Sequence, residues 1–180
     1  KRGLQLVNQG VIDAEAGRLE VTAQHYPNLL KIIEPIGVLH SGFYCLTKED
    51  CLLSSNTNII VHSGFQSAQS FCNSMSLICS FESNVTAIAR LLEKNITQSI
   101  LSSTMGADKI LCAMQTDTIY FRNEPSLARF SFHFVYKGHA SLVPQLEASM
   151  RQLKIKGSLP KLGANAIQIN SSCNKNIIAV

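Results

Sequence analysis

The sequence predicts an α/β protein whose strands form mainly parallel sheets. Strand-like and helix-like patterns alternate from about residue 58 to 121, and right-handed βαβ units are the usual connection for such an alternation. The chain has 180 residues, of which 46% are hydrophobic and 16% charged, so it can bury a sizeable core. Its apolar runs are far shorter than the roughly 20 residues that cross a bilayer, and no signal peptide is visible.

The first residues predict a short helix that leads into a strand. Gly10 can take the left-handed conformation that ends a helix, and Val11 with Ile12 then starts an apolar strand. The charged residues Asp13, Glu15 and Arg18 follow it. Charges at the carboxyl end of a strand are suited to holding a polar ligand. The alternative is a solvated loop with a local Glu–Arg pair.

Further strands are predicted at residues 29–33 and 43–46, with Pro35 and Gly37 interrupting the path between them, as at a crossing between two lobes. Beyond the crossing, strand-like segments alternate with helix-like ones. The predicted strands are 58–62, 77–81, 96–101, 118–121 and 130–136. The predicted helices are 66–75, 85–92, 107–114 and 142–153, with Ser83 or Asn84 capping the second and Ser141 the last.

The sequence before the first lobe crossing resembles a pattern found in a known protein family. The pattern begins with a G-x-x-D-G-E-x-x-R segment, which is matched here by Gly10, Asp13, Glu15 and Arg18, with Ala14 in place of the second glycine. Two further parts of the pattern follow in the expected order, Tyr-Pro-Asn-Leu at 26–29 and Glu-Pro-Ile at 34–36. This pattern resembles the bacterial extracellular solute-binding proteins of family 3, which are periplasmic type II binding proteins associated with amino-acid uptake. The resemblance runs from about residue 1 to 162.

The resemblance implies two α/β lobes joined by hinge strands, with lobe 1 incomplete because its N-terminal part has no counterpart here. Residues 1–42 would form part of lobe 1 and the first hinge crossing, and residues 43–129 would form lobe 2. Residues 130–162 would supply the return hinge strand and the C-terminal helix of lobe 1. Residues 163–180, rich in Asn and Ser, are expected to form a loosely ordered tail.

Function is expected to follow from closure of the two lobes over a small polar solute, an amino acid or a related zwitterion. The resemblance implies a periplasmic, monomeric protein that is not an enzyme, needs no cofactor, and delivers its solute to the membrane permease of an ABC transporter. A sensor module of the same fold, acting with a sensor protein, is the first alternative. A periplasmic dehydratase-like enzyme is the second, with Glu15 as its candidate titratable group.

Two clusters are the predicted ligand contacts. Arg18 can hold a carboxylate and Glu15 an ammonium group. The turn between a strand and a helix N-terminus can add backbone N–H donors, and its residues are Ser63, Gly64, Phe65, Gln66 and Ser67. An ordinary capped helix is the alternative for this turn.

The chain departs from the family pattern at two of these places. Phe65 stands where family members often have a small polar residue. Thr97 stands where they commonly have an aspartate near the ligand ammonium group, and a threonine cannot form that ion pair.

Other classes of function receive little support. The net charge of +4 is modest, and the basic residues form no stripe with interleaved aromatics, so no nucleic-acid partner is expected. The six cysteines show no zinc-site spacing, and no metal is expected. Cys45 with Cys51 and Cys72 with Cys79 are the nearest candidate disulfides, but the pattern slightly favours Cys72 and Cys112 as small buried hydrophobic residues. The five histidines are expected to be structural.

Overall fold

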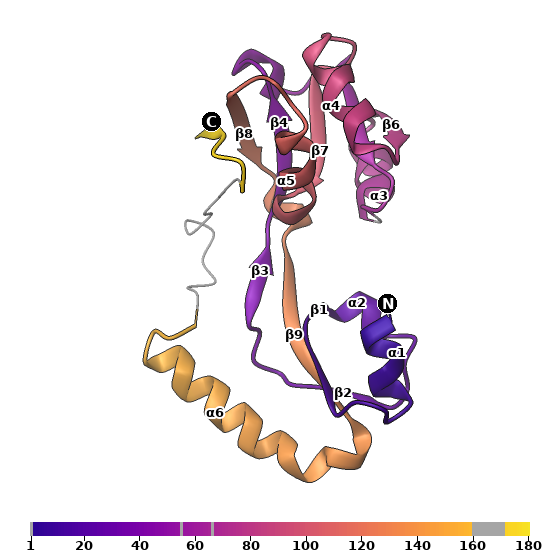
Figure 1. The fold of residues 1–180 in the computed structure, drawn as a ribbon, viewed down its shortest axis with the longest axis vertical. Helices are drawn as coiled ribbons and strands as arrows, with labels where there is room; N and C mark the ends of the chain where they lie inside the picture. The colour runs from indigo at the N-terminus through magenta and orange to yellow at the C-terminus, as the bar shows by residue number, and fades with distance from the viewer. Residues whose placement is uncertain (1, 55, 66, 160–171) are drawn as a thin grey trace. The chain divides into compact units, whose positions relative to one another are not determined.

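A computed structural model describes residues 2–54, 56–65, 67–159 and 172–180, and for Thr22 the backbone alone. The chain forms two units. Unit 1 comprises Lys1–Leu39 and Arg129–Ala166, and unit 2 comprises His40–Ala128 and Ile167–Val180. Each unit has a sheet of its own (Figure 1). Within the described residues, no helix is long and apolar enough to span a membrane.

Unit 2 is built on a six-stranded sheet with the order β10-β8-β4-β7-β5-β6. Its strands are β4 (Ser41–Cys45), β5 (Asn58–His62), β6 (Ile78–Glu82), β7 (Ser99–Ser103), β8 (Thr118–Asn123) and β10 (Asn176–Ala179). The pairings β5–β6, β5–β7 and β8–β10 are parallel. Strand β4 runs antiparallel to both of its neighbours. The prediction of a mainly parallel sheet therefore holds in unit 2, with β4 as the exception.

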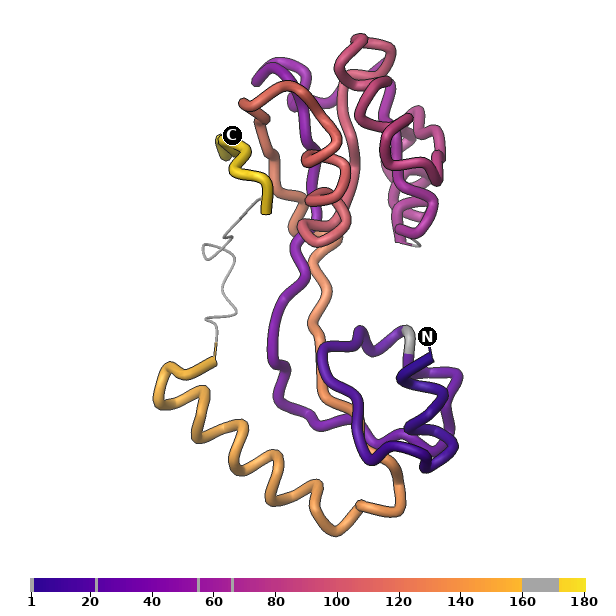
Figure 2. The backbone as a smooth tube through the Cα atoms, viewed as in Figure 1, coloured from indigo at the N-terminus to yellow at the C-terminus, as the bar shows by residue number. Residues whose placement is uncertain are grey.

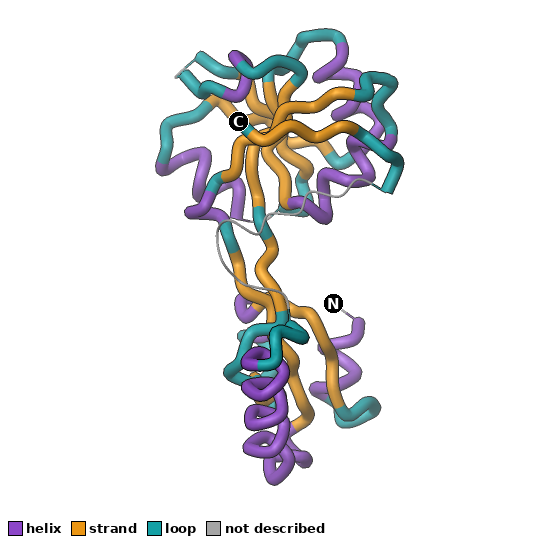
Figure 3. Tube along the Cα trace, turned by 90° about the vertical axis from the view of Figure 1, so that its left-hand side faces the viewer, coloured by secondary structure: helices purple, strands orange, loops and turns teal. Residues whose placement is uncertain are grey.

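Helices cover both faces of this sheet, as the tube coloured by secondary structure shows (Figure 3). Helices α4 (Val85–Glu93) and α5 (Thr104–Cys112) pack on the face that carries Tyr44 and Ile100. Helix α3 (Ser67–Ser74) and the short helices η1 (Glu49–Cys51) and η2 (Pro125–Leu127) contribute to the core on the other face, which carries Phe43. We call this second face the α3 face. Both faces are buried because the connections from β5 to β6, from β6 to β7 and from β7 to β8 each lay a helix over the sheet.

Local signals set several helix ends in unit 2. Asn84 caps α4, its Oδ1 accepting a hydrogen bond from the N–H of Ala87, as predicted. Ser103 caps α5 through the N–H of Gly106. Strand β7 begins at Ser99 instead of the predicted residue 96, because Ile96 is exposed and the chain is still turning there after α4.

Unit 1 is smaller, and its strand pairings within the described residues are all antiparallel. Strand β9 (Arg129–Tyr136) pairs with β1 (Ala14–Leu19), β2 (Leu29–Lys31) and β3 (Gly37–Leu39). The expectation of a mainly parallel sheet is therefore wrong here, because β9, which follows unit 2 in the chain, runs antiparallel to β1, β2 and β3. Helices α1 (Arg2–Asn8), α2 (Glu20–Ala23) and α6 (Val143–Ile155) complete the unit, with η3 (Lys137–Leu142) leading into α6.

Two predicted element ends in unit 1 differ from the structure. Gly10 has a φ of 70° and ends α1, as expected, but Val11 is exposed and the strand starts at Ala14. The charges Asp13, Glu15 and Arg18 therefore lie before or within β1, not after a buried strand. Helix α6 has Leu142 at its N-cap without a side-chain cap, so Ser141 does not cap it. Pro144 lies in the first turn of α6, and Gly157, with a φ of 70°, follows its end.

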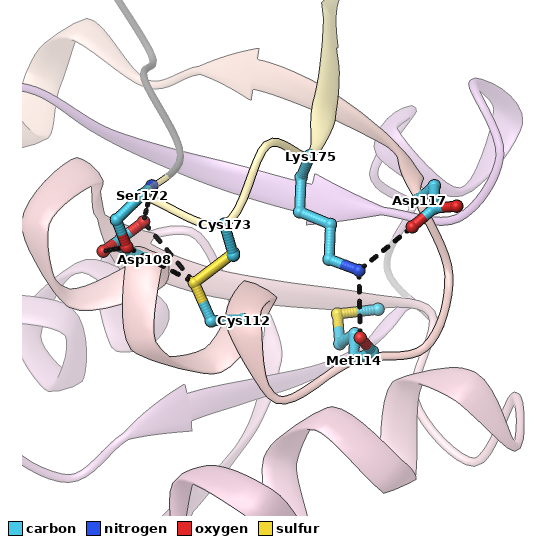
Figure 4. Close-up of a disulfide and its surroundings, with 7 residues drawn as sticks. All are labelled: Asp108, Cys112, Met114, Asp117, Ser172, Cys173 and Lys175. Atoms are coloured by element: carbon cyan, nitrogen blue, oxygen red, sulfur yellow. Dashed lines mark hydrogen bonds and ion pairs between the residues drawn. A yellow bond between two sulfur atoms is a disulfide. The ribbon is translucent and has the colours of Figure 1, made fainter.

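The C-terminal segment is folded wherever it is described, which corrects the prediction of a loose tail. The tube drawing shows the chain end beside β8 (Figure 2), where β10 adds a parallel edge strand and Ile177 packs on the core. Residues 163–171 lie outside the described part of the chain. Figure 4 shows the disulfide between Cys112 and Cys173 that holds this segment. Beside it, the Ser172 hydroxyl donates a hydrogen bond to the Asp108 carboxylate.

Two other disulfides join Cys45 to Cys51 and Cys72 to Cys79. Both are the nearest-neighbour pairs named from the sequence. The interpretation of Cys72 and Cys112 as unpaired hydrophobic residues is wrong. Cys72 is indeed buried in the core, and Cys112 is exposed on α5.

Candidate ligand-binding site

Glu15 and Arg18 form an ion pair with each other in β1. The Arg18 Nε donates to Glu15 Oε1 at 2.7 Å, and one terminal nitrogen of the guanidinium donates to the same oxygen. In a regular strand, residues three apart point to opposite faces. Here Gly17, with a φ of 68°, allows a bulge between Glu15 and Arg18, so both side chains lie on one face.

This face carries one of the two small core clusters of unit 1. Glu15 is opposite Phe134 and Arg18 is opposite Phe132, and both phenylalanines pack with Leu4 of α1. The Glu15 carboxylate also lies against Gly3, where an added Cβ would be 2.3 Å from it. The arrangement matches the local Glu–Arg pair named as the alternative. It also leaves N–H donors on Arg18, which is partly exposed.

Asp13, the third predicted charge, is engaged elsewhere. Its Oδ1 lies 2.7 Å from Nε2 of His139. The ring of Tyr136 meets that imidazole edge-on, and an added Cβ at Gly10 would lie 3.1 Å from the same tyrosine ring. Asp13 and His139 therefore act together in holding the end of β9 near the loop after α1.

The predicted turn of unit 2 lies at the carboxyl end of β5, but several of its N–H groups are already used. The N–H of Ser63 donates to the Glu82 carbonyl oxygen, that of Gly64 to His62 Nδ1, and that of Phe65 to the His62 carbonyl oxygen. Phe65 packs on the α3-face core, which explains an aromatic residue at this position. Gln66 lies outside the described residues.

Thr97 is a buried structural residue. Its hydroxyl lies 2.7 Å from the Asn58 carbonyl oxygen, to which it donates, before the start of β7. This is the amino end of the parallel strands β5 and β7. The departure predicted from the family pattern therefore falls at the opposite edge of the sheet from residues 63–67.

At the carboxyl edge of β5, β6 and β7, several strand ends bring polar residues together. Ser41 opens β4 opposite Ser103, the last residue of β7, and Asn123 ends β8 opposite Gly42. Glu82 ends β6 and accepts hydrogen bonds from the N–H groups of Asn84 and Ser83, which lower the pKa of its carboxyl group.

Buried polar atoms without hydrogen-bond partners concentrate at this edge. Among the described residues, six buried side-chain nitrogen or oxygen atoms have no hydrogen-bond partner. Four of them lie at this edge, at the start of β4 and at the end of its partner strand β8: His40 Nδ1, Ser41 Oγ, Arg122 Nε and Asn123 Oδ1. Burial also lowers the pKa of His40. A buried polar atom left without a partner costs about 1–3 kcal/mol, so such a concentration calls for a partner that is not part of the chain.

Comparisons with known proteins give the fold. No protein-family model matches the chain, and no curated protein matches it. Solved structures do match. Tv2483 bound to L-arginine is 17% identical, with a TM-score of 0.56 over 88% of this chain and 67% of that one. An ancestral cationic amino-acid solute-binding protein is 13% identical, with a TM-score of 0.63 over 86% and 69% of the two chains. The chain has the type II periplasmic binding-protein fold.

A sensor domain shares this fold. The periplasmic domain of BvgS from B. pertussis is 8% identical, with a TM-score of 0.61 over 83% of this chain and 30% of that one. At these identities the likeness concerns the fold alone. Open α/β sheets bind ligands outside the carboxyl ends of their strands, and this is the edge of unit 2 where the unpaired polar atoms lie.

Sequence reasoning missed His40, Ser41, Arg122 and Asn123. No local motif marks them, because strand pairing brings Ser41 beside residues about eighty positions away. The signal that was present is the polar end of each strand, such as Arg122 and Asn123 after the apolar stretch of β8.

Proposed function

We propose that this protein captures a small polar solute, an amino acid or a related zwitterion, and delivers it to the permease of an ABC-type importer without catalysing a reaction. The observation that carries the proposal is the set of four buried polar atoms without partners at the carboxyl edge of the unit 2 sheet. The type II fold supports it, since two of the three similar structures named above are an L-arginine complex and an amino-acid-binding protein. The proposed place of action is the periplasm.

The proposed ligand contacts include the residues predicted from the sequence. Arg18 would offer its remaining N–H donors, and Glu15 a carboxylate whose second oxygen, Oε2, has no hydrogen bond to Arg18. From the turn at 63–67, Ser63, Gly64 and Ser67 would contact the solute, and Phe65 would be an apolar support. Gln66 stays a proposed contact from the sequence alone. His40, Ser41, Arg122 and Asn123 are added from the structure.

Isothermal titration calorimetry of the purified chain tests this proposal. The panel contains neutral, acidic and basic L-amino acids and dicarboxylates. We expect saturable heat with at least one of these solutes and a loss of affinity of about 10- to 100-fold in Arg18→Gln, the amount expected for one charge-assisted hydrogen bond.

Arg90→Gln is the matched control, because Arg90 is exposed on α4 and should bind like the wild type. No heat with any solute would contradict the capture function. Unchanged affinity in Arg18→Gln would remove unit 1 from the proposed site.

Sensing is the second candidate function. The BvgS periplasmic domain favours it, because this sensor domain has the same fold as the chain. A transmembrane helix encoded downstream in the full gene would support sensing over import. Both candidates require capture of a solute, so the calorimetry tests them together.

A further inference from the structure

Arg122 is a half-buried cation with little to neutralise it. Its guanidinium carbon lies 4.7 Å from the centre of the Phe43 ring, and its Nε is buried without a hydrogen-bond partner. In the described part of the chain, no carboxylate forms an ion pair with it. A guanidinium carries five N–H donors, and a buried charge is costly unless it is paired.

Ser41 lies beside this cation on the same face of the sheet. Arg122 is directly opposite Phe43, and Ser41 is two residues before Phe43 on the same strand, so all three side chains point to the α3 face. Ser41 is 1% exposed and its hydroxyl has no partner. Two side chains with unused donors thus lie on one face of the sheet, and the Phe43 ring lies against the guanidinium.

The carboxylates at this edge are held by other groups. Glu124 Oε1 accepts hydrogen bonds from the Ser126 hydroxyl at 2.7 Å and the Ser126 N–H at 3.3 Å. Glu82 accepts from two backbone N–H groups at the start of α4. Both carboxylates keep their charge, but in the described part of the chain neither forms an ion pair with Arg122, so they leave its N–H donors available to an anion.

We infer that Arg122 and Ser41 form a carboxylate-binding subsite, so that unit 2 holds an anionic group of the solute and not its ammonium group. This inference rests on the proposed capture function and narrows its ligand to solutes with an accessible carboxylate. The guanidinium would donate to the carboxylate through Nε and a terminal nitrogen, in the bidentate geometry that favours arginine over lysine. The Ser41 hydroxyl would donate to the same group.

Nitrogen-15 NMR of arginine Nε–H groups tests the subsite directly. The Arg122 resonance is assigned by its absence in Arg122→Lys. The wild-type chain is then titrated with acetate and with glutarate, using sodium chloride and methylammonium chloride at matched ionic strength as controls. We expect a saturable shift of the Arg122 Nε–H with the two carboxylates and none with the chloride salts. If neither carboxylate shifts the Arg122 resonance, the inference is overturned, and a buried water becomes the indicated hydrogen-bond partner of Arg122 Nε.

Calorimetry with the solute panel separates this inference from the capture function. We expect Arg122→Gln to lose about 10- to 100-fold in affinity for carboxylate solutes, as for a charged hydrogen bond, and Arg90→Gln to lose none. If solutes bind but Arg122→Gln binds them equally well, capture stands and the subsite is refuted. If no solute binds while acetate still shifts the Arg122 resonance, the anion contact stands and the capture function fails.

Ser41→Ala distinguishes a binding role from a structural one. Because its hydroxyl has no partner, its removal should leave the free energy of unfolding unchanged or raise it, whereas affinity should fall about 3- to 10-fold. A loss of stability with unchanged affinity would show that Ser41 serves the fold alone.

Discussion

Replacing both cysteines of the Cys112–Cys173 disulfide by serine should destabilise unit 2 more than any other change to its C-terminal segment. The bond closes a loop with a sequence separation of 61 residues. In the chain-entropy description, cross-linking such a loop removes about 14 cal/mol/K from the unfolded state, which is about 4 kcal/mol at 25 °C. Cys112 is exposed on α5, so its replacement by serine adds little cost of its own.

Hydrogen bonds also hold the C-terminal segment, and the loss of one of them gives a stability change with which the loss of the disulfide can be compared. Ser172 donates to Asp108 through its N–H at 2.8 Å and through its hydroxyl at 2.7 Å. Lys175 donates to the Met114 carbonyl oxygen at 3.0 Å, as Figure 4 shows. Ser172→Ala removes one of these hydrogen bonds and keeps the disulfide, so it should cost about 1 kcal/mol.

Native-state hydrogen exchange measures both effects. Amides of the buried strand β4 report unfolding of unit 2, and amides of β10 report local release of the C-terminal segment. In Cys112→Ser/Cys173→Ser, we expect the free energy of opening at β4 to fall by up to about 4 kcal/mol and β10 to exchange first. If the double variant costs no more than Ser172→Ala at β4, the chain-entropy reasoning is wrong for this loop.

Three further predictions concern stability, each measured by urea unfolding. Asn84→Ala should cost about 1 kcal/mol because the N–H of Ala87 loses its cap, whereas Ser83→Ala should change little; equal losses would contradict the capping role. Gly42→Ala should cost about 1–3 kcal/mol or more, because its Cβ would lie 2.2 Å from the Arg122 carbonyl oxygen; a neutral effect would mean that β8 yields easily. Burial lowers the pKa of His40 and His133 below the ordinary 6.5, so the unfolded chain binds more protons than the folded chain. The free energy of unfolding should therefore fall as the pH drops from about 7.5 through 6.5, until the pKa values of the folded chain are passed. His40→Gln/His133→Gln should flatten that slope, and an unchanged slope would assign it to other groups.

The part of the fold that could be predicted from sequence is the part with local signals. Strand 58–62 was predicted with its exact bounds because its three central residues, Ile59, Ile60 and Val61, form an apolar run. Helix α4 followed from its apolar period and the cap at Asn84. Strand β10 was missed because Asn, Ser and Lys surround it and its stability comes from pairing with β8 and from a distant disulfide. Neither contact leaves a local pattern.

Strand β1 shows why the predicted charges were placed at the wrong end of a strand. An apolar pair at Val11–Ile12 looked like the start of a buried strand, but the left-handed Gly10 turns the chain so that Val11 faces solvent. The paired strand begins later, in a stretch whose composition is not strand-like. Its register on β9 depends on a bulge at Gly17. A bulge inserts a residue into the strand, and the two-residue alternation used to recognise strands does not predict such an insertion.

The candidate site also contains residues that are neighbours in the sequence and residues that strand pairing brings together. Glu15 and Arg18 are three residues apart, so a pairing between them could be named from the sequence as an alternative, and the structure has it. Arg122 and Ser41 become neighbours only because Phe43 is paired with Arg122 across β4 and β8. Their shared property, a buried polar atom without a partner, exists only after folding. Since an unpaired buried group lowers stability, the binding role proposed for these positions rests on a property of the folded chain that the sequence alone cannot display.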